Sequence, residues 1–151
     1  MIKVSVRSIR CTGFMKNLVT QEILEQAAQY LLRLQTARLD KGLGSEGEPL
    51  PPYSPGYAAF RSAHGRVVDR RTLTYTGQML AGRRVEAVNA SRVKLGWSPG
   101  TLEAKKAAGN EKRSPFVKAT PKEVKLVTEF IQRKIRERAK KILAEERAKK
   151  R

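Results

Sequence analysis

The segment that begins at Thr120 constrains the fold more than any other part of the sequence. Thr120 and Glu123 have the spacing of a capping box, and Pro121 suits the first position of a helix. Apolar residues then recur at steps of three and four residues, so a long helix is predicted, and its pattern fades after Leu143 into a frayed tail at residues 144–151. The apolar stripe consists of Val124, Val127, Ile131, Ile135 and Ile142, with Ala139 in the last gap.

A strand and a second helix are predicted in the N-terminal part. Apolar and polar residues alternate over residues 2–9, which is typical of a half-buried strand. Residues 20–40 follow a helical pattern, with Thr20 as the N-cap and Gly42 as the stop. One face of this helix is apolar and is expected to lie in the core: Ile23, Ala27, Tyr30, Leu31 and Leu34, widened by Leu24, Ala28 and Leu32.

Residues 42–66 lack a regular pattern over most of their length. Glycine and proline recur in the first half of this segment, and both disfavour helices and strands, so a long loop is predicted. Residues 57–63 are expected to form a short helical piece, with Tyr57 and Phe60 packed inward. A loop of this length is usually functional or mobile.

A short helix and a β-hairpin are predicted next. The helix is expected over residues 72–80, with Thr76 and Gly77 at its start or just inside it. Residues 83–88 and 91–97 alternate between apolar and polar types, and the residues between them suit a hairpin turn.

The remaining segment completes a single α+β domain of residues 1–151. Residues 101–108 are expected to be helical, residues 109–113 to form a basic loop, and residues 114–117 to be extended because of the proline. The predicted fold is a small antiparallel sheet packed with a long N-terminal helix and a long basic C-terminal helix, plus an extended Gly/Pro loop.

The composition indicates an anionic partner and a reducing compartment. The chain has 32 Lys and Arg against 14 Asp and Glu, a net charge of +18, whereas small soluble domains carry about 2–8. A field of this sign attracts nucleic acid, an acidic protein surface or anionic lipid. Cys11 is the single cysteine, so no internal disulfide can form. No apolar run reaches the ~20 residues of a membrane span, and no signal segment is evident, so cytoplasm-like surroundings without a membrane are expected.

Catalytic motifs are few. The chain has no phosphate-binding glycine loop, no dinucleotide-binding motif and no zinc-protease motif, and His64 is the only histidine. One pattern is typical of magnesium-dependent nucleases, in which carboxylates bind Mg²⁺ and a lysine steers water: Glu103 and Lys105, with Asp69 and Glu86 upstream. Here, however, the Glu-x-Lys pair is common by composition and is expected in a helix. We therefore predict a protein that is not an enzyme and that has no cofactor or metal.

Four short motifs follow one another in a fixed order. A Gly-x-Pro loop with a later Ser-x-x-Tyr precedes Leu-x-x-Thr-Gly, then a strand ending in Val-x-Leu-Gly, and then Pro-Phe before the last helix. The residues are Gly47, Pro49, Ser54 and Tyr57; Leu73, Thr76, Gly77 and Leu80; Val93, Leu95 and Gly96; and Pro115 and Phe116. Over about residues 15–140 this order resembles the phage virion morphogenesis family, the tail-completion and neck proteins of Mu-like and related tailed phages. The chain departs from the family where aromatic residues are common before the Pro-Phe, and where Leu-Gly commonly follows it.

The resemblance implies a structural virion protein. Copies would form a ring, expected to be six-fold, at the head-tail junction, as a tail-completion, tail-terminator or neck protein in contact with neighbouring neck, tail and head-completion proteins. DNA would pass through the lumen, which suits a basic chain that holds phosphates without reading bases. The protein would be found in the virion, and in the host cytoplasm during assembly. The cations expected to face DNA are Arg70, Arg71, Arg83, Arg84, Lys105, Lys106, Lys112 and Arg113.

Alternatives remain open from the sequence. The charge could face solvent or an acidic partner ring in place of DNA. The chain could also be a non-specific DNA-binding protein outside any virion, or the nuclease considered above. The Gly/Pro loop and the last helix are the segments expected to contact neighbouring subunits.

Overall fold

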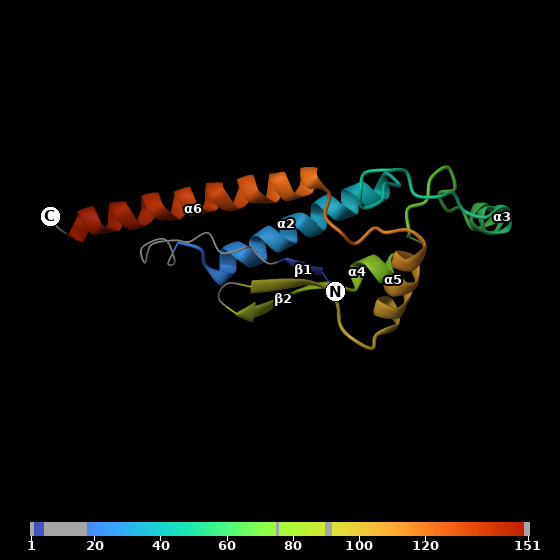
Figure 1. The fold of residues 1–151 in the computed structure, drawn as a ribbon, viewed down its shortest axis with the longest axis horizontal. Helices are drawn as coiled ribbons and strands as arrows, with labels where there is room; N and C mark the ends of the chain where they lie inside the picture. Colours follow the sequence, from blue (N-terminus) through green and yellow to red (C-terminus); the bar gives the residue numbers. More distant parts are fainter. Residues whose placement is uncertain (1, 5–17, 75, 90–91, 150–151) are drawn as a thin grey trace.

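The computed structural model describes residues 2–4, 18–74, 76–89 and 92–149, and it has the predicted α+β fold (Figure 1). The first long helix, Gln21–Asp40, lies between the N-terminal strand on one side and the C-terminal helix on the other. The elements are β1 (Ile2–Val4), α2 (Gln21–Asp40), α3 (Pro55–Ala63), α4 (Gln78–Ala81), β2 (Arg83–Asn89), β3 (Arg92–Trp97), α5 (Leu102–Arg113) and α6 (Pro121–Lys149).

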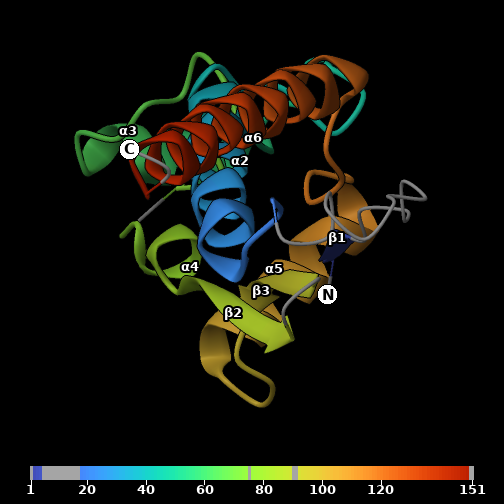
Figure 2. The same ribbon diagram turned by 90° about the vertical axis from the view of Figure 1, so that its left-hand side faces the viewer.

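The molecule is layered, with α6 on α2 and α2 on the sheet (Figures 1 and 2). The strand order is β1-β3-β2, and both pairings are antiparallel, as predicted. Residues 5–9 of the predicted first strand and the hairpin turn at 90–91 lie outside the described residues, as does Cys11.

Helix α2 is buried on two sides because its apolar face is wide. Ala27 and Leu31 of α2 share one cluster with Leu95 of β3 and Val127 of α6. A neighbouring cluster joins α2 to the sheet. Burying an aliphatic side chain of this size contributes about 1.5–3 kcal/mol, so these contacts are what hold the layers together.

The caps of the two long helices are as predicted. The Thr20 hydroxyl accepts from the amide of Ile23, and Gly42 ends α2 with a positive φ of 72°. At the start of α6, Thr120 Oγ1 accepts from the Glu123 amide at 3.1 Å, and the Glu123 carboxylate accepts from the Thr120 amide at 2.8 Å. Helix α6 continues to Lys149, past the point where the sequence pattern fades.

Two predicted boundaries between residues 72 and 113 are wrong. The helix expected over residues 72–80 is reduced to α4, because Leu73 and Gly77 have positive φ angles (56° and 81°) that a right-handed helix excludes. The loop expected at residues 109–113 is the last part of α5. There the Glu111 carboxylate accepts hydrogen bonds from the backbone amides of Phe116 and Val117, which holds the helix end against the following segment.

The orientation predicted for the short helical piece is also wrong. Tyr57 and Phe60 are 41% and 46% exposed, whereas Arg61 of the same helix is buried. Helix α3 stands at one end of the molecule, beyond the sheet (Figure 1), and none of its residues belongs to the apolar clusters of the described chain. Its aromatic residues therefore have no core to enter.

A candidate binding cavity beside helix α5

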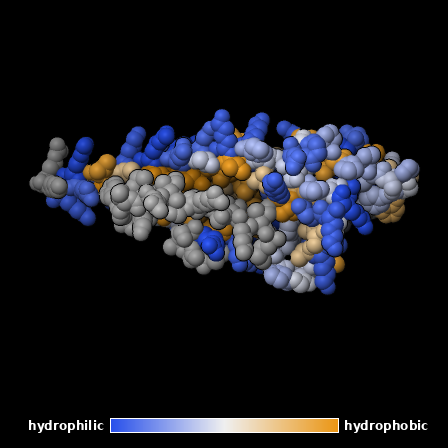
Figure 3. Space-filling view, viewed as in Figure 1, coloured by the Kyte–Doolittle hydropathy of each residue, from blue (hydrophilic) through white to orange (hydrophobic). Residues whose placement is uncertain are grey.

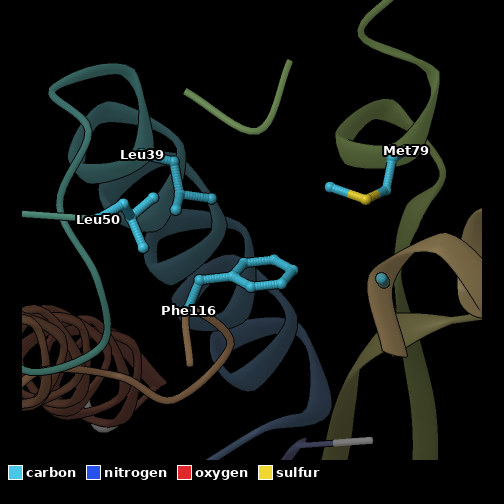
Figure 4. Close-up of a cluster of buried hydrophobic side chains, with 5 residues drawn as sticks. Leu39, Leu50, Met79 and Phe116 are labelled. Atoms are coloured by element: carbon cyan, nitrogen blue, oxygen red, sulfur yellow. The ribbon is translucent and has the colours of Figure 1, made fainter. Parts of the chain in front are cut away.

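A hydrophobic cluster gathers five segments of the chain at the end of the sheet (Figure 4). Leu39 at the end of α2 lies near Phe116, as does Leu50 of the loop before α3, here called the Gly/Pro segment (residues 42–54). Met79 of α4 points toward them from the other side. Ala107 of α5 completes this cluster. The cluster fixes α4 and α5 relative to the Gly/Pro segment, and so fixes the walls of the cavity that opens beside it.

The cavity has a volume of about 620 Å³ and lies between the Gly/Pro segment with α3 and the pair α4 and α5. A volume of this size is within the range of small-molecule and peptide pockets. Met79 belongs both to the cluster and to the cavity wall. The polar groups of the wall that carry amides or hydroxyls are Ser54, Thr76, Gln78 and Asn110, and two tyrosines, Tyr53 and Tyr57, line the α3 side.

The charged residues that line this cavity are all cations: Arg61, Arg71, Lys106 and Arg113. Lys106 and Arg113 are exposed and lie on one face of α5, one helical repeat of seven residues apart, with Asn110 between them. No acidic residue lines the cavity in the described part of the chain, so these cations repel one another and an anion in the cavity is favoured.

Arg61 is held in place from several directions. Its Nε donates to the Val67 carbonyl and its Nη2 to the Thr74 carbonyl, both at 3.0 Å. Its guanidinium lies 4.5 Å from the ring centroid of Tyr53, a cation–π distance. Tyr53 is held in turn, because its hydroxyl accepts from the Thr72 amide. Arg61 therefore shapes the wall and fixes the turn that carries Arg71.

Arg71 is half-buried, and the donors of its guanidinium have few hydrogen-bond acceptors among the described residues. Its Nη1 reaches Ser114 Oγ at 3.5 Å, the long limit for a hydrogen bond. Its Nε is buried and has no acceptor among the described residues. An unmatched buried donor on a cation costs free energy, which a nearby anion would offset.

The structure brings together several residues of the sequence motifs. Ser54, Tyr57, Leu73, Thr76 and Gly77 line the cavity. The hydrophobic cluster beneath includes Phe116, with Leu73 and Leu80 packed against it. The remaining motif residues lie elsewhere. Val93 and Leu95 are buried against α2, and Gly96 follows them on β3. Gly47 and Pro49 are exposed in the loop, and the Pro115 carbonyl accepts from the Ser45 amide.

The cations that were expected to face DNA are scattered. Arg71, Lys106 and Arg113 line the cavity, whereas Arg70, Arg84, Lys105 and Lys112 are exposed outside it.

The expectation for Arg83 is wrong. This residue is buried and donates to Leu80, Gln35 and Thr36 inside the molecule. Burial, together with the nearby charge of Arg38, lowers the pKa of Arg83 to about 10, while Asp40 acts in the opposite direction. In the alternation of β2, Arg83 lies on the same face as Val85, and this face packs against α2.

The carboxylates of the nuclease pattern do not converge. Asp69 pairs with Arg70, Glu86 lies opposite Lys94 on β3, and Glu103 packs where a side chain at Gly82 would be. In the described part of the chain, no group of three or more His, Cys, Asp and Glu residues is placed to hold a metal ion. No helix among the described residues is both long enough and apolar enough to cross a membrane.

Sequence reasoning missed Tyr53, Arg61, Gln78 and Asn110 as cavity residues. One signal was available: Tyr57 and Arg61 are four residues apart, the spacing of neighbouring side chains on one face of a helix. Tyr53 lies before α3, so helical spacing does not place it. Gln78 and Asn110 are placed by tertiary packing and carry no local signal.

No family model, no curated protein and no solved structure matches this chain.

Proposed function

We propose that this protein is a structural virion protein of a tailed phage, which forms a ring at the head-tail junction as a tail-completion, tail-terminator or neck protein. The observation that carries the proposal is the convergence of the motif residues. Ser54, Tyr57, Leu73 and Thr76 come from separate segments of the sequence and line one cavity. Residues of a shared motif set that meet at one surface support a common role in recognition.

Helix α3 supplies a surface suited to contact between subunits. It stands at the end of the molecule (Figure 1), and Tyr57 and Phe60 are exposed there together with Val67 and Val68 of the following segment. Exposed apolar groups gathered in one place commonly mark interaction sites. A ring needs two different patches on each subunit, so that each copy binds the next head to tail. In this proposal α3 is one of the two.

The proposal is tested by the mass of the assembled protein. Native mass spectrometry and light scattering are measured on the purified full chain, alone and mixed with phage tail tubes. We expect rings, six-fold in the simplest case, or a ring-sized addition to the tube ends. Phe60→Asp with Val68→Asp should abolish assembly, because two charges would be buried at the contact.

The matched control is Leu102→Asp with Ala108→Asp, at exposed residues that both lie on α5. This control should assemble normally. A chain that stays monomeric alone and also adds nothing to the tail tubes would exclude the ring. Equal loss in the two double variants would exclude α3 as the contact.

A second candidate is a non-specific DNA-binding protein outside any virion. The net charge of +18 favours it. Tight binding to duplex DNA without any association with phage particles would replace the ring proposal by this one.

A further inference from the structure

The cavity beside α5 presents several cations to a ligand. Of its four cations, Arg61 is already engaged with two carbonyls and the Tyr53 ring. Arg71, Lys106 and Arg113 remain to meet a ligand. Charged donors bind carboxylate and phosphate oxygens about twice as strongly as neutral donors do, so the ligand class is an anion, and its source must be decided from the other groups of the wall.

The aromatic residues of the wall are poorly suited to nucleobases. Proteins bind single-stranded nucleic acid by stacking bases on open aromatic faces. Here the Arg61 guanidinium lies over the Tyr53 ring, and Tyr57 meets Tyr53 edge to face at 5.3 Å. Tyr57 also stacks on Phe60. These intramolecular contacts take up part of the surface of each ring, and a concave cavity cannot follow the convex backbone of a duplex.

The other wall groups suit a peptide. Asn110 Nδ2 already donates to the Lys106 carbonyl, and the Thr76 hydroxyl donates to Gln78 Oε1. The amide oxygen of Asn110, the amide nitrogen of Gln78 and the hydroxyl of Ser54 can bond to a peptide backbone. Met79 and Leu73 provide an apolar floor for one side chain. The guanidinium of Arg71, whose buried Nε has no acceptor among the described residues, carries a positive charge that a nearby carboxylate would offset.

We propose that this cavity binds an acidic peptide segment of another protein, with carboxylates at Arg71, Lys106 and Arg113 and an apolar side chain against Met79. The choice of a neighbouring virion protein as the source of that segment rests on the proposed function. The peptide chemistry itself does not, because a monomer contains the whole cavity.

Helix α5 offers a matched pair of variants. Lys106 and Arg113 line the cavity, whereas Lys105 and Lys112 are equally exposed neighbours on the same helix and do not. Lys106→Glu with Arg113→Glu and Lys105→Glu with Lys112→Glu therefore change the net charge by the same amount. Exposed helix positions of this kind tolerate substitution, and a thermal melt of each variant verifies folding. If a double variant is unfolded, the corresponding pair of Gln substitutions replaces it in both sets.

The experiment measures fluorescence anisotropy of a labelled acidic peptide, made of Asp and Glu around one Leu, with the full-length protein. Its amide counterpart of Asn and Gln and a labelled oligothymidylate serve as the other probes. We expect the cavity pair to weaken binding of the acidic peptide at least about tenfold, and the matched pair to weaken it less than about threefold. The amide peptide should not bind.

Three results would overturn the proposal. Equal losses in the two pairs would mean a diffuse attraction without a site. Binding of the amide peptide as tight as that of the acidic peptide would remove the carboxylate requirement. If Lys106→Glu with Arg113→Glu weakened the binding of oligothymidylate more than the binding of the acidic peptide, the cavity would be a nucleic-acid site. Failure of the ring would appear separately, in the mass measurement with the α3 variants.

Discussion

A single side chain, Arg38, connects most of the segments that surround the core. Its Nε donates to the Glu123 carboxylate at 2.8 Å, in a salt bridge that is buried on both sides. The other donors of its guanidinium reach the carbonyls of Leu43, Gly44, Phe116 and Lys118. All five donors of the group are used, so the charge is satisfied although it is removed from water. Arg38 thereby joins α2, the Gly/Pro segment, the Pro-Phe segment and the capping box of α6.

Arg38→Met should lower the free energy of unfolding by about 3–5 kcal/mol, because the Glu123 carboxylate and the carbonyls would remain buried without a donor. Urea denaturation followed by circular dichroism measures the loss. Combining Arg38→Met with Glu123→Gln should cost less than the sum of the single changes, since the second change removes the unpaired charge.

The control at the residue scale is Arg133→Met. Arg133 reaches Glu137 at 3.9 Å with both side chains mostly exposed, and an exposed pair contributes about 0–1 kcal/mol. If Arg38→Met cost no more than this control, water would be replacing the guanidinium, and Arg38 would not be organising the surrounding segments.

At the scale of elements, sequence reasoning succeeded where the signal was local. The caps at Thr20 and Thr120 and the stop at Gly42 are each set by residues a few positions apart, and the boundaries of α2 and the start of α6 follow from them. The ends of α4 and α5 were not predictable in this way. Glu111 holds the Pro-Phe segment, and Arg61 holds the Thr74 carbonyl, through contacts that local periodicity does not encode.

Gly109 gives a direct test of the extended α5. Its backbone is helical, and an added Cβ would meet no heavy atom within 4 Å. Gly109→Ala should therefore raise the free energy of unfolding by about 0.4–1 kcal/mol, because alanine loses less conformational entropy in a helix. Thermal and urea unfolding of the full chain measure the change.

Gly100 is the matched control, just before α5. An added Cβ has open space there too, but φ is 80°. Gly100→Ala should destabilise by about 1–2 kcal/mol, the cost of a left-handed L-residue. A loss of stability at Gly109 similar to that at Gly100 would show that residues 109–113 are not helical in solution.

At the scale of the whole molecule, the layers followed from amphipathic faces, but the pairing of distant groups did not. The stripes of α2 and α6 predicted burial, and the structure places α2 between α6 and the sheet. Nothing in the sequence pairs Arg38 with Glu123, which are 85 residues apart. The cavity could not be predicted from the sequence for the same reason, because its walls come from the Gly/Pro segment, α4 and α5. In α3, Arg61 is buried and Tyr57 and Phe60 are exposed, which is the reverse of the prediction.

The shape of the molecule separates the cavity from a row of exposed cations on α6. Helix α6 runs past the start of α2 at the end of the molecule opposite α3 (Figure 1), and hydrophilic side chains project along its outer edge (Figure 3). Lys125, Arg136 and Lys140 are exposed and share one helical face. They span about 22 Å at 1.5 Å per residue, a length over which a duplex presents several phosphates.

Duplex DNA should therefore bind to α6 rather than to the cavity. Reversing Lys125, Arg136 and Lys140 to Glu should weaken binding equally for all sequences and reduce the slope of log K against log salt by about 2–3. Filter binding at several salt concentrations measures the slope. The same variant should leave binding of the acidic peptide within about twofold of the unmodified chain, because none of the three residues lines the cavity.

Arg84, Lys105 and Lys112 provide the comparison for this prediction, as exposed cations from β2 and α5 that carry the same total charge. Their reversal to Glu should change the slope less, because no single helix aligns them. A larger change in this second triple would move the DNA contact to the β2 and α5 side, where the lumen was first expected. Equal changes in both triples would mean that DNA responds to the net charge of +18 alone, since long-range attraction depends on total charge and not on its arrangement.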